Sequence, residues 1–356
     1  MKTTIVLGTR PEIIKLAPII KKLDKRRYSV VFSGQHFEHK MGLQFIDELE
    51  LPKPNHTMKL TGKTPSIQIS EIILKLSKIL SDEKPDTVIV QGDTNTVLAA
   101  SICSIKQKIP ISHVESGLRS YDWRMPEEHN RIAVDHISEV LFAPTSKSKQ
   151  NLLSENVHGS IHVTGNTVID AINMYSRISK QKSQLSMDEN FALLTLHRAE
   201  NVDNKKSLSS IIKGLIDSNE NIVFPVHPRT KKCLIEFDLF SKLKKSNNIK
   251  LLDVVGYFEM LELMKKCSFI VTDSGGIQEE STAPQIRKKV LVLRKTTDRP
   301  ETVEYKMSEL IGLNSKTISN KIKKTFENPK ISTRKTPYGN GNASSKIIEI
   351  LKKYYS

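Results

Sequence analysis

The chain of 356 residues has few cysteines, few aromatic side chains and no long apolar run, and each shortage excludes a class of protein. Its three cysteines, Cys103, Cys233 and Cys267, are far apart, without a CxxC pair or a histidine cluster beside them. This argues against a zinc site or a disulfide framework and favours a reducing compartment. No stretch reaches the ~18–20 apolar residues of a membrane span. Because the apolar run at the N-terminus is too short for a signal peptide, a soluble cytoplasmic protein is expected.

Acidic residues are fewer than basic ones: the chain has 55 Lys and Arg but 39 Asp and Glu, and its formal net charge is +16. A positive charge of this size suits nucleic acid or a small anionic substrate. The lysines, however, are scattered along helix-like segments, and only 6% of the residues are aromatic, so a base-stacking surface is not expected. The sequence therefore favours a small anionic partner and argues against nucleic acid.

Two phosphate-binding motifs are also missing. No GxxxxGK sequence occurs, and the stretch GTRPE (8–12) has Arg, Pro and Glu where a dinucleotide-binding GxGxxG turn has its further glycines. Their absence disfavours an NTPase and a dinucleotide-dependent oxidoreductase. We expect neither a cofactor nor a metal.

What the chain does contain is a regular alternation of short apolar runs and helix-like stretches. This pattern is typical of βαβ units with a parallel sheet covered on both faces. The expected strands are 3–8, 29–34, 86–92, 111–116, 140–144, 191–197, 221–227, 249–254, 269–273 and 290–294.

The polar segment 176–190 is the long break in this alternation, and the chain length suits two domains. We predict an α/β protein with two Rossmann-like doubly wound domains facing a central cleft. The first comprises residues 1–175 with a C-terminal helix at 342–356, and the second comprises residues 176–341. Ligands of such sheets bind beyond the carboxyl ends of the strands, beside helix N-termini.

Charged side chains gather just after the predicted strands. Folding alone explains any one of them, because Asp caps helices and proline opens them. A chain that needed only caps would not place Arg, His and Glu at so many strand ends. The side chains at these positions include Arg10, Glu12, Asp93, His113, Glu115, Glu127, Glu128, Arg131, His197, Asp273 and Arg299.

The segment DSGGIQEE (273–280) is the most informative of these strand ends. A strand, then Ser-Gly-Gly, then a helix directs free backbone N–H groups and the helix dipole at an anion. Glu280 on that helix suits the two hydroxyl groups of a ribose, and Arg10 and Arg299 suit a diphosphate. These residues fit a nucleoside diphosphate carrying a sugar on which several carboxylates act.

Eight sequence blocks in order, over about residues 1–350, resemble the non-hydrolysing UDP-N-acetylglucosamine 2-epimerases: GTRPEIIKLAP, GDTNT, HVESGLRS, MPEEHNR, LHRAEN, HPR, DSGGIQEE and TDRPE. The resemblance implies a glycosyltransferase-B type fold, a last helix that returns to the first domain, and a homodimer. It also implies that UDP-GlcNAc and UDP-ManNAc interconvert by elimination of UDP to 2-acetamidoglucal and its re-addition. The product would supply activated ManNAc for glycan or polysaccharide synthesis.

The resemblance also implies roles for single residues. Asp93, Glu115 and Glu127 match the catalytic carboxylates, and His197 matches the functional histidine. Which carboxylate is the acid and which the base does not follow from the sequence. The residues that match the substrate-binding set are Arg10, Lys15, Glu128, Arg131, Ser274, Gly275, Gly276, Glu280 and Arg299.

Three segments depart from the family pattern. Gln35 and His36 match a second site through which substrate activates many bacterial relatives, but Glu38 replaces an amide there, which argues against activation. The stretch 253–260 lacks the usual proline and glutamine that contact uracil, and 281–289 is about two residues longer than usual. Three alternatives stay open: a hydrolysing 2-epimerase that releases UDP and ManNAc, a glycosyltransferase-B type sugar transferase, and a regulator that binds nucleotide sugars without turnover.

Overall fold

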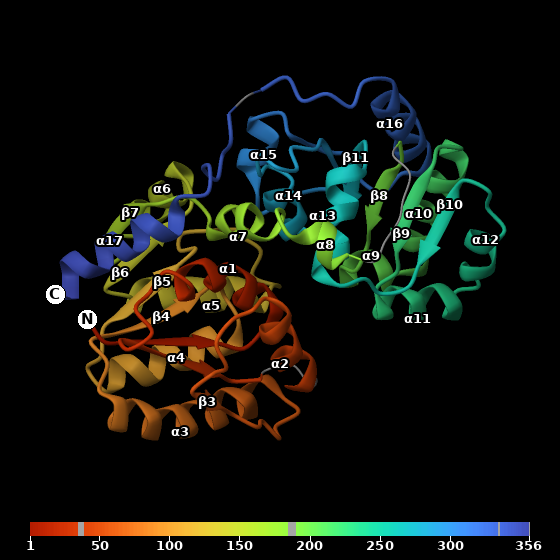
Figure 1. The fold of residues 1–356 in the computed structure, drawn as a ribbon. Coiled ribbons are helices and arrows are strands. Elements are labelled where there is room, and N and C mark those ends of the chain that lie inside the picture. Colours follow the sequence, from red (N-terminus) through yellow and green to blue (C-terminus); the bar gives the residue numbers. More distant parts are fainter. Residues whose placement is uncertain (35–38, 184–189, 334, 356) are drawn as a thin grey trace. The chain divides into compact units, whose positions relative to one another are not determined.

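The computed structural model describes residues 1–34, 39–183, 190–333 and 335–355, and the chain forms two compact units (Figure 1). The first unit comprises Met1–Ala171 and Tyr338–Ser356, and the second comprises Ile172–Pro337. Across the described ranges, no helix is long and apolar enough to cross a membrane.

The described part of the first unit holds a seven-stranded parallel sheet in the order β3-β2-β1-β4-β5-β6-β7. Ile5 of β1 lies opposite Val30 on one side and Ile89 on the other, so the strand order reverses beside β1. This is the doubly wound arrangement, in which ligands bind where the order reverses. The strands are β1 (Thr3–Leu7), β2 (Tyr28–Phe32), β3 (His56–Thr57), β4 (Thr87–Gln91), β5 (Ile111–Val114), β6 (Val140–Ala143) and β7 (Ser160–Val163).

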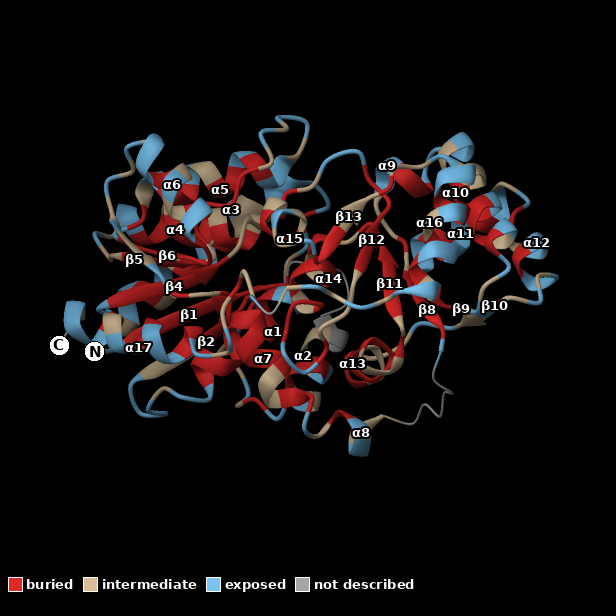
Figure 2. Ribbon diagram, turned by 90° about the horizontal axis from the view of Figure 1, so that it is seen from above, coloured by how far each residue is buried: buried red, intermediate tan, exposed pale blue. Residues whose placement is uncertain are grey.

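Helices pack on both faces of this sheet (Figure 2). Its central strands are buried throughout, which is why they appear in the sequence as continuous apolar runs. On one face lie α3 (Pro65–Glu83), α4 (Asn95–Lys106), α5 (Pro126–Ile137) and α6 (Ser146–Ser154), and on the other α1 (Arg10–Ile20), α2 (His39–Glu48), α7 (Thr167–Tyr175), which crosses into the second unit, and α17 (Ala343–Tyr355).

The second unit repeats the plan, with a six-stranded parallel sheet in the order β10-β9-β8-β11-β12-β13. Its strands are β8 (Ala192–Thr195), β9 (Ile222–Pro225), β10 (Ile249–Leu252), β11 (Phe269–Thr272), β12 (Val290–Val292) and β13 (Ser308–Leu310). Its helices are α8 (Ser179–Lys182), α9 (Ala199–Val202), α10 (Lys205–Ser218), α11 (Pro228–Glu236), α12 (Phe240–Lys244), α13 (Tyr257–Lys266), α14 (Gly275–Glu280), α15 (Pro300–Glu304) and α16 (Ser315–Glu327).

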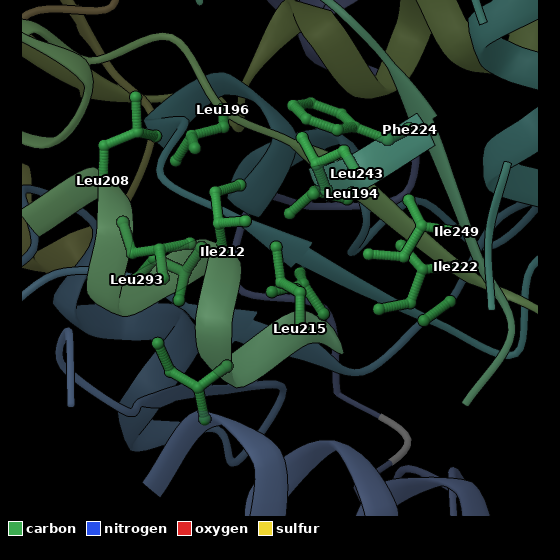
Figure 3. Close-up of a cluster of buried hydrophobic side chains, with 14 of the residues drawn as sticks. Leu194, Leu196, Leu208, Ile212, Leu215, Ile222, Phe224, Leu243, Ile249 and Leu293 are labelled. Carbon is green, nitrogen blue, oxygen red and sulfur yellow. The ribbon is translucent and has the colours of Figure 1, made fainter. Parts of the chain in front are cut away.

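The core of the second unit forms where α10 lies on the sheet. Leu208, Ile212 and Leu215 recur along one face of α10 and point at the strand side chains, as Figure 3 shows. Each fully buried side chain of this size contributes about 1.5–3 kcal/mol. Gly214 lets α16 approach α10 closely, because a Cβ there would lie 2.8 Å from Ile318.

The structure confirms the predicted α/β class and the two doubly wound sheets. All ten predicted strands exist, but β3, β7 and β13 were not predicted. β3 has only two residues, and both ends of β7 are exposed, so neither forms an apolar run.

Candidate functional site

The turn between β1 and α1 is shaped by close packing. A side chain at Gly8 has no room, because its Cβ would overlap the hydroxyl groups of Ser33 and Thr96. Thr9 occupies the N-cap position of α1. Pro11 lies in the first turn, where a missing N–H costs nothing. The turn is thereby fixed beside the start of α1.

Two predicted site residues are exposed at helix starts of the first unit. Arg10 is exposed, and its guanidinium carbon lies 4.6 Å from the centre of the Phe45 ring. Glu127 is exposed in the first turn of α5, where a carboxylate interacts favourably with the helix dipole. Both side chains are therefore accessible to a ligand.

Glu12 is buried beneath this turn. Its Oε2 accepts hydrogen bonds from the backbone N–H groups of Gly8 and Thr9. Burial raises the pKa of Glu12 to about 7, and hydrogen bonds from Thr94, Gly8 and Thr9 offset only part of the increase. A carboxyl group that titrates near neutral pH thus holds the turn that carries Arg10.

This gives a testable pH dependence of stability. The folded protein holds the Glu12 proton more tightly than the unfolded chain, so the contribution is complete below pH 4.5 and is lost as the pH rises through about 7. The loss amounts to about 3 kcal/mol. In urea unfolding, the free energy of unfolding of Glu12→Gln relative to that of the wild type should rise by about this amount between pH 5 and pH 8. The exposed Glu349→Gln should show no such gain, and a pH-independent effect of Glu12→Gln would contradict the prediction.

Asp93 lies just beyond β4, after Gly92, whose φ of +81° favours glycine. Its carboxylate forms an ion pair with Arg131 of α5, and the side-chain amide of Asn130 donates to the Asp93 backbone carbonyl over 2.9 Å. The Asp93 side chain is 27% exposed, whereas that of Arg131 is 6% exposed. A buried cation thus orients a carboxylate that remains accessible.

Glu115 directly follows β5 and has a φ of +69°, in the left-handed region. Such a conformation costs a non-glycine residue about 1–3 kcal/mol and is common at functional sites. Its Oε2 accepts hydrogen bonds from Nζ of Lys15 and from Nδ2 of Asn166, the latter 3.1 Å long. Lys15 and Glu115 therefore form a buried ion pair in the first unit.

Asp93 and Glu115 leave neighbouring strands at the same edge of the sheet. β4 and β5 pair in parallel, with Gln91 opposite Val114. The two carboxylates follow these residues, and each is paired with its own cation. The structure thus groups the two acids at one end of adjacent strands, where the sequence predicts the ligand to bind.

Glu128 is buried, and its carboxylate oxygens are used within the first unit. They accept from the backbone N–H and hydroxyl of Ser120, the backbone N–H of Tyr121, and Nη1 of Arg131. The last bond is 3.1 Å long. Glu128 therefore fixes the loop before α5 and orients Arg131, while its substrate-binding role stays a prediction.

A buried pair connects the loops that carry the two acids. His113 of β5 bonds Oδ1 of Asp135 through Nδ1 over 2.7 Å and donates from Nε2 to the Gly92 carbonyl over 2.8 Å. Oδ2 of Asp135 accepts from the Gly117 backbone and pairs with Arg119. Burial alone would raise the pKa of Asp135, but His113 and Arg119 hold that pKa below its usual range. The His113–Asp135 pair therefore fixes the backbone at Gly92, just before Asp93, and at Gly117, just after Glu115.

In the second unit, Asp273 follows β11 and is fully buried. It accepts hydrogen bonds from the backbone N–H groups of His197 and Arg198, from Nδ1 of His197 over 3.0 Å, and from Asn201 over 3.1 Å. Burial would raise the pKa of Asp273, but these donors and the charge of His197 lower it. Asp273 therefore fixes the position of His197, whose side chain is 40% exposed.

The predicted anion turn comes next along the chain. Ser274 caps α14, with its Oγ accepting from the Ile277 backbone over 3.4 Å. A Cβ at Gly275 would lie 3.3 Å from the Asp298 carboxylate, and one at Gly276 would meet only Ser274, at 3.8 Å. The backbone is therefore approachable at Gly276.

Arg299, by contrast, is buried and engaged within its unit. Its Nε donates to Glu279, and its Nη1 donates to Asp298 over 2.9 Å. Arg294 binds the other Asp298 oxygen over 3.0 Å. Glu280 is half-buried at the end of α14. A diphosphate contact by Arg299 thus stays a prediction, since its described partners are acids of its own unit.

The predicted residues are divided between the two units. Gln35 and His36 lie outside the described residues. Within the described ranges, no group of three His, Cys, Asp or Glu side chains could hold a metal ion. The first group is Arg10, Lys15, Asp93, Glu115, Glu127, Glu128 and Arg131, and the second is His197, Ser274, Gly275, Gly276, Glu280 and Arg299.

The sequence pattern missed Asn166, which binds Glu115. This residue also follows a strand, but that strand is β7, whose sequence SIHV has no apolar run. Had β7 been predicted, the position of Asn166 would have placed it among the candidates.

Comparison with known proteins gives consistent matches. A family model described as UDP-N-acetylglucosamine 2-epimerase matches residues 20–352. A UDP-N-acetylglucosamine 2-epimerase of Methanocaldococcus jannaschii is 43% identical over 99% of each chain.

Two solved structures are similar over nearly the whole chain. One is the Methanocaldococcus jannaschii UDP-GlcNAc 2-epimerase in complex with UDP-GlcNAc and UDP, with a TM-score of 0.88, 43% identity, and coverage of 99% of this chain and 100% of the other. The second is the Neisseria meningitidis UDP-GlcNAc 2-epimerase bound to UDP-GlcNAc, with a TM-score of 0.87, 36% identity and the same coverage. This chain thus has the two Rossmann-like sheets of the glycosyltransferase-B type fold that its sequence predicts.

Proposed function

Because the chain belongs to the UDP-N-acetylglucosamine 2-epimerase family, we propose that it is an isomerase that interconverts UDP-GlcNAc and UDP-ManNAc. The observation that carries the proposal is the pair of acids, Asp93 and Glu115, at neighbouring strand ends. Each carboxylate is held by a cation, so both have defined directions.

The chemistry explains why more than one carboxylate is needed. The C2 hydrogen is not beside a carbonyl group, so its simple removal would leave an unstabilised carbanion. When UDP leaves C1 with the electron pair of the C1–O bond, the C2–H electron pair forms a C1=C2 double bond instead. Return of a proton to the other face of C2, with return of UDP to C1, gives the epimer. Each direction therefore needs a base and an acid at C2.

We assign the proton transfers at C2 to Asp93 and Glu115, with Glu127 assisting. Lys15 and Arg131 are buried and hold these acids in place, so we propose that they position the acids in addition to the substrate-binding role predicted for them. Arg10 is exposed at the start of α1 and is proposed to bind the substrate.

In the second unit, the proposal assigns UDP binding to the Ser274–Gly276 turn, Glu280 and Arg299. The approachable backbone at Gly276 and the N-terminus of α14 support an anion there. His197, oriented by Asp273, is proposed to offset the charge of departing UDP. The elimination route involves no net oxidation and so requires no nicotinamide.

We also propose that the protein acts in a reducing cytoplasm as a homodimer. The three cysteines are buried and free, which supports the compartment. The dimer rests on the family resemblance alone, and light scattering of the purified protein would test it.

Proton NMR of UDP-GlcNAc mixed with the protein in D2O tests the function. We expect UDP-ManNAc to form, with deuterium entering C2 of both sugars. Free ManNAc accumulating one-for-one with UDP would indicate the hydrolysing reaction instead. Unlabelled UDP-GlcNAc after long incubation would overturn the proposal.

A further inference from the structure

Asn166 lies between β7 and α7, and its side chain makes two hydrogen bonds with different purposes. Oδ1 accepts from the Val168 backbone N–H over 3.0 Å at the start of α7. Nδ2 donates to Oε2 of Glu115 over 3.1 Å. Because the first bond uses the amide oxygen, the nitrogen must face Glu115. The helix start therefore fixes the direction of the amide.

The backbone of Asn166 is held from a distant part of the chain. Its N–H donates to the Tyr338 carbonyl over 2.9 Å. The preceding Gly165 has a φ of +94°, and a Cβ there would lie 2.9 Å from the same carbonyl. Asn166 is 2% exposed, and Tyr338 is fully buried. The amide is thus anchored before it meets Glu115.

Glu115 receives Lys15 and Asn166 on the same oxygen, Oε2. Its backbone already has the left-handed φ of +69°. A strained backbone and two donors on one oxygen restrict the rotation of this carboxylate. Asn166 supplies one of these restraints without adding charge to the Glu115–Lys15 ion pair.

We propose that Asn166 is a positioning residue, a neutral donor that holds the Glu115 carboxylate in the orientation that proton transfer requires. The inference rests on the role proposed for Glu115 in the epimerisation. Small misplacements of a reacting group are costly, on the order of 10²-fold in rate. A buried donor fixed from two sides prevents such a misplacement.

Two variants separate this role from helix capping. Asn166→Asp keeps an oxygen for the Val168 N–H but loses the donor and places a negative charge beside Glu115. Asn166→Ser keeps a capping hydroxyl and loses the donor without a new charge. We expect kcat to fall by about 10²-fold in Asn166→Asp and by about 10-fold in Asn166→Ser, with KM and UDP affinity nearly unchanged.

The pH profile gives a signature that capping would not give. In Asn166→Asp the added charge disfavours the ionised form of Glu115, so the acidic limb of the kcat profile should move to higher pH. Asn166→Ser should move it less. The charged groups on the elements around Glu115 are unchanged in both variants, namely Lys15 of α1, His113 of β5, Asp93 after β4, and Asp135 and Arg131 of α5.

Asn314→Asp is the matched control, because Asn314 caps α16 by accepting from the Thr317 backbone over 3.1 Å in the second unit. It should keep the wild-type kcat and pH profile. Thermal unfolding should show that all three variants are folded. If Asn166→Asp is not folded, the kcat of Asn166→Ser tests the inference in its place.

Carbon-13 NMR of labelled glutamate carboxyls, assigned with Glu115→Gln, tests the contact without turnover. We expect the Glu115 titration to move to higher pH in Asn166→Asp. An unmoved titration, or wild-type kcat and pH profile in that variant, would overturn the inference. An inactive wild type would overturn the proposed function instead, and the shifted titration would still support the contact.

Discussion

Asp93→Asn should lower the turnover of UDP-GlcNAc by about 10²–10⁴-fold while UDP binds with nearly unchanged affinity. The amide has the shape of the carboxylate, and its oxygen can still accept from Arg131, so the local fold should survive. The loss arises because an amide cannot take up and return the proton at C2. Turnover is measured by NMR and UDP affinity by calorimetry.

Asp24→Asn is a suitable control, since Asp24 also pairs with an arginine, Arg26, but on an exposed surface. This variant should keep wild-type turnover. If Asp93→Asn exchanged the C2 proton with solvent at the wild-type rate, another group would have to carry the proton.

Asp273→Ala should lower the free energy of unfolding by about 3 kcal/mol, because it leaves several buried donors without an acceptor. Asp273 accepts from the backbone N–H groups of His197 and Arg198 and from the side chains of His197 and Asn201. Urea unfolding of the full chain near neutral pH measures the loss.

The pH dependence checks the cause. The pKa of Asp273 is lowered in the folded state, so its contribution is present above the usual carboxyl range and is lost as the pH falls through the lowered value. Asp253→Ala, whose side chain is 93% exposed, should change stability by less than about 0.5 kcal/mol. Equal unfolding of Asp273→Ala and Asp253→Ala would show that the donors find other partners.

The fold could be predicted where a strand is buried on both faces. β1 and β4 are buried at every residue, so their apolar runs are visible in the sequence. β13 has three residues, two of them partly exposed, and no local pattern marks it. Such strands depend on pairing with a neighbour, and single-sequence patterns contain no record of that pairing.

The candidate site likewise contains residues that the local sequence predicts and contacts that it does not. Asp93 and Glu115 could be predicted because a position just after a strand is local information. The bond from Asn166 to Glu115 joins residues 51 positions apart, and the bond from His113 to Asp135 joins residues 22 apart. Glu128 resembles an ordinary acidic residue in a first helical turn, yet three-dimensional packing buries it. Contacts that depend on topology were therefore beyond the sequence pattern.

The last helix, α17, has a consequence for how the protein is made. It belongs to the first unit, where Ile347 and Leu351 are buried and Asp170 accepts from the backbone of Ala343 and Ser344. A ribosome therefore synthesises the whole of the second unit before it supplies the part that completes the first. During translation, the apolar face of the first unit that α17 covers stays exposed until the second unit has been synthesised. A premature stop codon near residue 340 would therefore impair the folding of the first unit, although most of that unit is synthesised first.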